Sequence, residues 1–307
     1  MGNVIGTGIL RFFGFCFGAL PRRMQMAAGR ALGSILYFFR LRFSVVDQNL
    51  KFAFPNDPEQ REKTARAFYA HLGQLILEVF LLFGPLKKFV EKYVVMEGRE
   101  HIENGLAKGK GILFLSSHVG NWEIMAASYG VTAKEGLLLV TKQLKPSWLH
   151  NAIEEGRRRC GVAGTYEPRT IRDVFSYLKK NKAVGIVLDQ YAGAPIGVRV
   201  PLFGVPVGTS SALATLARRT GAAVLPVENF RNPDGTWIVR IHPALEWKTE
   251  DDAEHSREVV TNTAHYVEQV ESHIKSHPDQ WLWMHRRFKG ELGALSAEEL
   301  AGARART

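Results

Sequence analysis

The clearest signal for the fold lies in one stretch, Gly111-Ile-Leu-Phe-Leu-Ser-Ser-His118-Val-Gly-Asn-Trp-Glu123. A short apolar run enters a turn of small residues, a histidine stands in that turn, and a carboxylate follows five positions later. An apolar run bounded by turn residues is typical of a buried strand. A strand that ends in this way delivers an acid–base pair to the edge of a sheet.

Short apolar runs alternate with helical patterns from Val94 onward. We expect strands at 112–115, 137–140, 184–188, 223–227 and 237–241, and helices at 122–129, 147–160, 170–180 and 210–219. This alternation predicts an α/β fold whose central sheet is mainly parallel and flanked by helices. There is no internal repeat or low-complexity linker, so residues 41–290 are predicted to form one domain. Residues 291–307 lack an apolar stripe and are expected to be a flexible tail.

The segment 1–40 is predicted to consist of helices that associate with a membrane. Residues 4–20 are almost wholly apolar, although Arg11 and four glycines weaken the run. Because a spanning helix needs about 20 apolar residues, this run is only a marginal candidate for a span. A second apolar stretch, 27–39, ends in Arg40. Apolar segments with basic flanks are typical of helices on an anionic membrane face, and a pair of buried core helices is the alternative.

Residues 44–90 carry a helical pattern. Asn56 or Asp57 can cap a helix, and the apolar run 71–83 stops at Gly84-Pro85, a common helix terminator. Helices this apolar must pack against the main domain or the membrane.

The charge balance narrows the class of partner. The chain of 307 residues carries 40 basic and 30 acidic residues, a formal net charge of +10. This favours an anionic partner such as phospholipid headgroups, an acidic carrier protein or nucleic acid. No helix-turn-helix, zinc-finger or RNP signature is present, so we expect no nucleic acid. Two cysteines, Cys16 and Cys160, exclude a disulfide framework and a cysteine-based zinc site.

A histidine followed five positions later by an acidic residue occurs twice, at His118/Glu123 and His150/Glu155. With 30 acidic residues in 307 and ten histidines, about one match is expected by chance. His150 lies within an expected helix, where positions five apart differ by about 140°, so we interpret this pair as a solvated surface coincidence. His118 instead follows a strand end, and Asn121 can cap the next helix and place Glu123 in its first turn.

The loop from His118 to Asn121 lets the imidazole and the Glu123 carboxylate meet. A carboxylate on one ring nitrogen fixes the tautomer, and the other nitrogen can take a proton from an attacking hydroxyl. This is the chemistry needed to acylate an alcohol. The alternative is a core histidine satisfied by a nearby carboxylate.

Asp189 ends another apolar strand. Because ligands gather at the carboxyl ends of strands in open α/β sheets, Asp189 and His118 are predicted to share a cleft. The alternative is a loop cap that organises residues 191–193.

Three consecutive arginines, Arg157, Arg158 and Arg159, follow a helix with an apolar face. The arginine fork matches phosphate oxygens in bidentate geometry, which favours a phosphate clamp. A solvated basic helix end is the alternative.

These motifs together resemble a known family. Ser116-Ser-His118-Val-Gly-Asn-Trp-Glu123 resembles the His-x4-Glu signature of the lipid A biosynthesis (late) acyltransferases of the lauroyl/myristoyl type, within the glycerol-3-phosphate acyltransferase-like superfamily. Four further elements resemble that family in the expected order: Gly156-Arg157-Arg-Arg159, Val187-Leu-Asp189-Gln190, Val200-Pro-Leu-Phe-Gly204-Val-Pro206-Val-Gly-Thr209 and Pro278-Asp-Gln-Trp281-Leu-Trp283-Met-His-Arg286-Arg287-Phe288. The resemblance covers about residues 5–290. The superfamily's acid-and-arginine phosphate binder is missing from 206–210, so glycerol-3-phosphate binding is not carried over.

The resemblance implies a transferase at the inner (cytoplasmic) membrane, with its catalytic domain facing the cytoplasm. The donor would be an acyl thioester of acyl carrier protein or CoA, and the acceptor a hydroxyl of a phosphorylated glycolipid, a lipid A precursor. No cofactor and no metal are expected. His118 would be the general base and Glu123 the carboxylate that orients it. The implied substrate-binding residues are Asn121, Arg157, Arg159, Asp189 and Gln190.

Several readings stay open at this point. Another glycolipid or an aminolipid could be the acceptor, and a non-catalytic membrane scaffold is a further class. A lipid esterase is suggested by Gly208-Thr-Ser210-Ser-Ala212, which approaches Gly-x-Ser-x-Gly but lacks the last glycine; Thr209 or Ser210 can simply cap the next helix. The aromatic and basic cluster within 281–289 can sit at a membrane interface or pack against the sheet.

Overall fold

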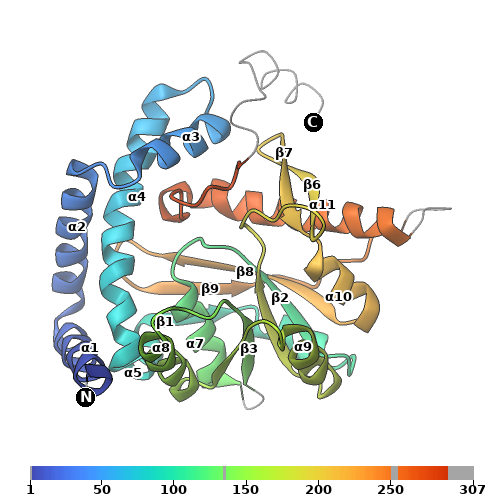
Figure 1. Cartoon of the computed structure of the whole chain (residues 1–307), viewed down its shortest axis with the longest axis horizontal. Coiled ribbons are helices and arrows are strands. Elements are labelled where there is room, and N and C mark those ends of the chain that lie inside the picture. Colours follow the sequence, from blue (N-terminus) through green and yellow to red (C-terminus); the bar gives the residue numbers. More distant parts are fainter. Residues whose placement is uncertain (1, 134–135, 250–254, 290–307) are drawn as a thin grey trace.

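The computed structural model describes residues 2–133, 136–249 and 255–289 (Figure 1). The predicted flexible tail, 291–307, lies outside the described residues. A seven-stranded sheet in the order β1-β9-β8-β2-β5-β3-β4 forms the centre, and β6 and β7 form a separate two-stranded sheet. The strands are β1 (Val94–Glu97), β2 (Ile112–Ser116), β3 (Leu137–Val140), β4 (Val162–Thr165), β5 (Ala183–Val187), β6 (Gly197–Leu202), β7 (Val205–Ser210), β8 (Ala223–Arg231) and β9 (Trp237–Ile241).

Within the seven-stranded sheet, every neighbouring pair is parallel except β8 and β9. The predicted mainly parallel α/β fold is therefore confirmed. All five expected strands are present, and the structure adds β1, β4 and the β6–β7 hairpin. The helices are α1 (Gly2–Ala19), α2 (Arg22–Phe38), α3 (Phe43–Ala53), α4 (Pro58–Val79), η1 (Phe80–Phe83), α5 (Leu86–Tyr93), α6 (Arg99–Leu106), α7 (Trp122–Thr132), α8 (Ser147–Arg159), α9 (Thr170–Lys179), α10 (Ala212–Thr220), α11 (His255–Ser276) and η2 (Pro278–Gln280).

Strand β2 lies in the middle of the sheet and is buried along its whole length. Leu113 and Leu115 contribute to one core, which includes residues of α3, α4, α9, α10 and α11. Ile112 and Phe114 contribute to a second core with residues of α6 and α7. A parallel strand covered on both faces needs apolar residues at every position, which is why β2 reads as a continuous apolar run.

Residues 44–90 form helices, as predicted. The Asp57 side chain caps α4 by accepting a hydrogen bond from Gln60 N at 2.8 Å, and Gly84 ends η1. Among the described residues, Pro58–Phe83 is the one helical stretch long and apolar enough to cross a membrane, but 61% of its apolar window is buried inside the protein. A core helix passes the same test.

The N-terminal helices pack onto this helical layer. Gly33 of α2 lies against the backbone of Tyr69, and Gly73 of α4 lies against that of Gly29, so neither position has room for a Cβ. Helix α1 is a shorter apolar helix that leaves large side chains exposed along its length: Ile5, Ile9, Phe12, Phe13 and Phe15. The membrane association of residues 1–40 stays a prediction.

Candidate active site

The site is built where β2 and β5 end. These strands are parallel neighbours, with Ser116 opposite Val187, so the residues that follow them meet at one edge of the sheet. His118 Nδ1 lies 2.7 Å from Asp189 Oδ1, and His118 N donates to Asp189 Oδ2 at 2.7 Å. The predicted proximity of Asp189 and His118 is confirmed, and the carboxylate does not cap the loop at 191–193.

The Asp189 carboxylate is buried and ionised. Trp281 Nε1 donates to its Oδ2 at 2.7 Å, alongside the His118 backbone. Burial opposes the charged form, but the charge and hydrogen bonds of His118 outweigh it and hold the pKa of Asp189 at about 2, below its usual 3.8. An ionised carboxylate only accepts hydrogen bonds, so Nδ1 of His118 carries a proton and Nε2 is left as the basic nitrogen.

The opposite side of the His118 ring faces the remaining site residues. Gln190 Nε2 lies 3.4 Å from His118 Nε2. The rings of Trp122 and His285 lie 4.8 and 5.1 Å from the imidazole, centroid to centroid. Burial and the His118 charge lower the pKa of His285. With its side chain only 11% exposed, His118 is largely shielded from solvent.

The predicted pairing of Glu123 with His118 is wrong in this structure. Glu123 lies in the first turn of α7, as expected, but its two oxygens accept from Arg157 Nε at 2.9 Å and Arg157 Nη2 at 2.6 Å. The physical reason is the partner that each carboxylate meets: Glu123 of α7 pairs with Arg157 of α8, whereas Asp189, which follows β5, meets the imidazole. A bidentate guanidinium leaves Glu123 engaged away from the ring.

This ion pair also corrects the role expected for Arg157. Its third nitrogen, Nη1, donates to Glu154 at 2.8 Å, and its side chain is 10% exposed. Although burial opposes the charged form, Glu123 and Glu154 raise the pKa of Arg157. All three nitrogens therefore face carboxylates, and the guanidinium is not free to clamp a phosphate.

Arg159 remains accessible, but it faces a different part of the molecule. It lines a pocket between α1 and α8 together with Arg11 and Trp148, and its Nε lies 3.5 Å from Glu155. The phosphate-binding role predicted for Arg159 stays a prediction, and it would act in that pocket and not beside His118.

Asn121 caps α7, as predicted from the sequence. Its Oδ1 accepts from Glu123 N at 3.1 Å and Ile124 N at 3.2 Å. Its Nδ2 donates to Glu78 at 3.1 Å, and the residue is 1% exposed. In this structure the buried amide holds the loop and the helix start together, and the substrate contact predicted for Asn121 stays a prediction. Gly120, with φ +70°, makes the turn before it.

Two further sequence interpretations are settled by burial. His150 is buried, with its ring edge-on to Tyr166 at 5.1 Å. The prediction that His150 and Glu155 form a solvated surface pair is therefore wrong for His150. Ser210 Oγ accepts from Ala212 N at 3.3 Å near the start of α10, whereas Thr209 is buried and accepts from Arg287 Nη2 at 2.5 Å.

Within the segment 281–289 the two tryptophans and Arg287 are packed inside the protein, whereas Arg286 and Lys289 are exposed. Trp281, Trp283 and Arg287 are each no more than 1% exposed, and Arg287 Nη1 donates to Gly208 O at 2.6 Å. Burial lowers the pKa of Arg287 to about 10. Sequence reasoning missed the contact of Trp281 with Asp189 and that of His285 with His118, because no local spacing connects these residues.

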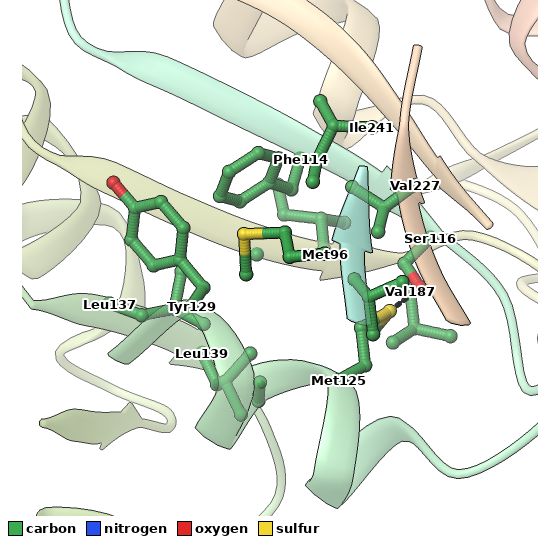
Figure 2. A pocket seen from close by; sticks show the side chains of 14 residues that line it. Met96, Phe114, Ser116, Met125, Tyr129, Leu137, Leu139, Val187, Val227 and Ile241 are labelled. Atoms are coloured by element: carbon green, nitrogen blue, oxygen red, sulfur yellow. Dashed lines mark hydrogen bonds between the residues drawn. The ribbon is translucent and has the colours of Figure 1, made fainter. Parts of the chain in front are cut away.

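An apolar cavity lies next to the site, between α7 and the sheet (Figure 2). The space that it leaves free in this structure is small, about 30 Å³. Ser116 and Met125 line its end near the His118 loop, and Tyr129 and Leu137 line the other end. The remaining walls are almost entirely apolar: Met96, Phe114, Ala126, Leu139, Gly185, Ile186, Val187, Val227, Val239 and Ile241.

Comparison with known proteins gives one family. Residues 4–290 match the model of the bacterial lipid A biosynthesis acyltransferases. A lipid A biosynthesis lauroyltransferase of Escherichia coli (strain K12) is 29% identical over 93% of this chain and 90% of its own length. A lipid A biosynthesis palmitoleoyltransferase of the same strain is 26% identical over 92% and 90%. A phosphatidylinositol mannoside acyltransferase of Mycobacterium tuberculosis (strain ATCC 25618 / H37Rv) is 28% identical over 67% and 63%.

Proposed function

The chain belongs to the bacterial lipid A biosynthesis acyltransferase family and is an acyltransferase, and from this premise we propose that it moves a fatty acyl chain from a thioester to a hydroxyl of a lipid A precursor. The observation that carries this proposal is the contact of His118 Nδ1 with the ionised Asp189. It leaves Nε2 as a positioned base at the edge of the sheet.

The reaction follows from that tautomer. The acceptor hydroxyl binds at His118 Nε2, close to where the Gln190 amide lies. Its proton passes to Nε2, its oxygen attacks the thioester carbonyl, and Asp189 stabilises the imidazolium that forms. The C–S bond then breaks, and the leaving thiolate takes the proton back from the imidazolium. An ester and a free thiol result, with no acyl-enzyme.

We infer that the acyl chain of the donor reaches the apolar side chains shown in Figure 2. The free space between them is about 30 Å³, so the lining has to move apart to take the chain. The lining is apolar apart from a few groups such as Ser116 Oγ, whose hydroxyl can donate to Met125 Sδ or to the Ser117 carbonyl, each 3.3 Å away. A chain entering past Ser116 would place its carbonyl carbon at the His118 loop.

The partners and location follow from charge and the exposed helix. An acidic acyl carrier protein suits the net charge of +10, and CoA is the alternative donor. The exposed apolar residues of α1 are suited to burial in a membrane surface. We place the protein at the inner membrane with the site facing the cytoplasm, where carrier-bound acyl chains are available to it.

The experiment is an acyl-transfer assay on membranes that contain the protein, with radiolabelled acyl carrier protein thioesters and a tetra-acylated, phosphorylated glucosamine disaccharide. A labelled penta-acylated product is expected. His118→Ala should abolish it, and His101→Ala, at the half-exposed start of α6, is the matched control. Transfer that survives His118→Ala refutes the mechanism. Phosphatidylinositol mannosides are tested in parallel as acceptors. If the label moves only to them, the proposed acceptor is wrong but the proposed reaction stands.

A further inference from the structure

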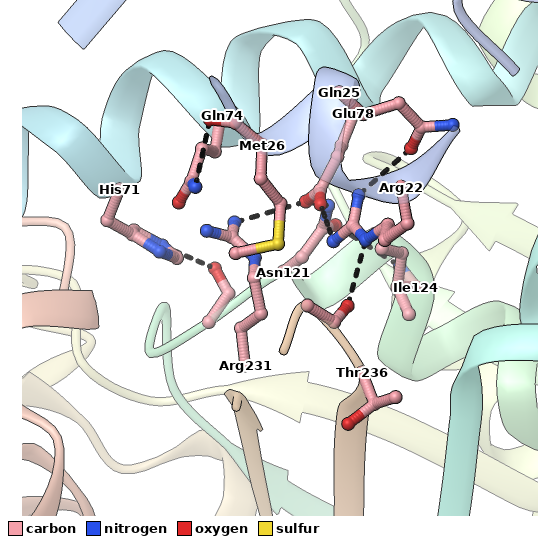
Figure 3. Close-up of polar contacts among 12 residues, drawn as sticks. Arg22, Gln25, Met26, His71, Gln74, Glu78, Asn121, Ile124, Arg231 and Thr236 are labelled. Carbon is pink, nitrogen blue, oxygen red and sulfur yellow. Dashed lines mark hydrogen bonds and ion pairs between the residues drawn. The ribbon is translucent and has the colours of Figure 1, made fainter. Parts of the chain in front are cut away.

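A second buried charge cluster lies behind the His118 loop. Glu78 of α4 accepts from Arg22 of α2 at 2.6 Å and from Arg231 of β8 at 3.2 Å (Figure 3). The three side chains are 1%, 7% and 4% exposed. One carboxylate therefore joins the N-terminal helix pair to the central sheet, in a place where water does not screen the charges.

Arg22 has its whole guanidinium engaged. Nε donates to Gly235 O at 2.9 Å, Nη1 to Gln25 Oε1 at 3.0 Å and Nη2 to Glu78. Gly235 belongs to the turn between β8 and β9, so this single side chain fixes α2 against both α4 and the sheet. Arg23, the next residue, is exposed.

The same carboxylate holds the active-site loop. Glu78 Oε2, which faces Arg231, also accepts from Asn121 Nδ2 at 3.1 Å. Asn121 then caps α7 through Glu123 N and Ile124 N. Arg22 is thus connected to Asn121, the last residue of the His118 loop, through Glu78, which contacts both side chains.

A parallel connection runs through Arg231. Its backbone N–H donates to Gln280 Oε1 at 2.8 Å, and its carbonyl accepts from Gln280 Nε2 at 3.0 Å. The backbone carbonyl of Gln280 accepts from Gly120 N at 3.0 Å. Both arginines of the cluster are therefore two contacts away from the turn that presents His118.

We propose that Arg22 and Glu78 are positioning residues for the His118 loop, so that helix α2 is required for catalysis itself and not only for attachment to a membrane. Glu78 keeps its orientation because Arg22 occupies Oε1. Without Arg22, the carboxylate can rotate to meet Arg231 with both oxygens, and Asn121 loses its acceptor. The loop then has one fewer fixed end, while His118 and Asp189 are chemically unchanged.

Charge balance makes Arg22 the side chain to change. Two guanidinium groups face one carboxylate, so Arg22→Met leaves a neutral Glu78–Arg231 pair and no unpaired buried charge. Glu78→Gln would instead leave two buried cations without a carboxylate, which is strongly destabilising. Arg22→Met should therefore fold, and Arg23→Met is the control that removes the same charge from the same helix turn.

The experiment has two parts, both on the full chain in detergent micelles, where attachment to a membrane does not limit the rate. Hydrogen exchange followed by mass spectrometry should show faster exchange of the 118–124 amides in Arg22→Met than in wild type or Arg23→Met. The transfer assay should show kcat lower by about 10- to 100-fold in Arg22→Met, the range expected when a reacting group is displaced by up to about 1 Å. KM should stay within a factor of two, and Arg22→Lys should recover part of kcat because it restores a charge beside Glu78.

The outcomes are distinct. The inference is overturned if Arg22→Met has wild-type exchange in 118–124, or if Arg22→Met and Arg23→Met lose kcat equally. It is also overturned if the loss of kcat matches the loss of folded protein. The kinetic arm rests on the proposed function, whereas the exchange arm does not. A wild-type protein that transfers no acyl group would count against the proposed function alone.

Discussion

Asp189→Asn separates the two carboxylates that could orient His118. In the wild type, Oδ2 accepts from His118 N and from Trp281 Nε1, and Oδ1 accepts from His118 Nδ1. An asparagine has one oxygen and one NH2 group. Two donors converge on the Oδ2 side, so the amide oxygen will take that side and the NH2 group will face Nδ1.

This arrangement reverses the tautomer of the imidazole. Nδ1 must accept from the asparagine, so the ring proton moves to Nε2 and the base is lost from the reacting side. The corresponding change in serine protease triads lowers kcat by about 10⁴, equivalent to about 5 kcal/mol of barrier. We expect a fall of kcat of at least about 10³ for Asp189→Asn. Folding should be kept, because two of the three hydrogen bonds survive.

The assay is the single-turnover rate of acyl transfer at saturating acceptor, with thermal unfolding measured on the same sample. Glu123→Gln is the comparison, because it changes the other candidate carboxylate by the same single atom. Wild-type kcat in Asp189→Asn, together with a loss of about 10³ in folded Glu123→Gln, would refute the contact-based assignment and favour Glu123 as the orienting group.

Three other outcomes are expected. Arg157→Met should destabilise by about 3–5 kcal/mol, because it leaves the buried Glu123 without a cation, whereas Glu123→Gln should cost less because Arg157 keeps its ion pair with Glu154; the double variant should be more stable than Arg157→Met in a urea-unfolding cycle. Burial lowers the pKa of His273 from 6.5 to about 4. Between these pH values the unfolded state binds a proton that the folded state does not, so the free energy of unfolding should fall by about 3 kcal/mol as pH drops from 6.5 to 4. In His273→Gln this loss should be smaller. Leu139→Phe narrows the apolar cavity and should shift transfer to shorter acyl chains in a competition assay, whereas exposed Ile171→Phe should not.

Much of the secondary structure could be read from the sequence because it depends on local patterns. The apolar run of β2, the Asp57 cap and the Gly84 terminator were all found in place. Helix α11 was missed although a signal exists: Tyr266, Val267, Val270 and Ile274 recur at helical spacing and are buried.

The β6–β7 hairpin carries a weaker local signal. Pro201 and Pro206 lie opposite each other in its ladder, and proline is depleted from strands because it cannot donate to the ladder. The hairpin forms because its inward side chains pack on the core next to α11. Its end also supplies Gly208 O and Thr209 Oγ1 to Arg287, a contact that no pattern in the sequence predicts.

Local patterns along the chain are enough to predict that a strand ends at His118, that Asn121 starts the following helix, and that Asp189 stands at the same sheet edge. These features depend on strand order and on hydrogen bonds between residues two or three positions apart. Which carboxylate meets the imidazole could not be predicted from those patterns and depends on how distant parts of the chain pack together. Asp189, which meets the imidazole, lies 71 positions from His118 in the chain. Glu123, the acid nearer in sequence, instead pairs with Arg157, 34 positions away. A hydrogen bond depends on where a side chain points as well as on distance along the chain, and the fold points Glu123 of α7 at Arg157 of α8.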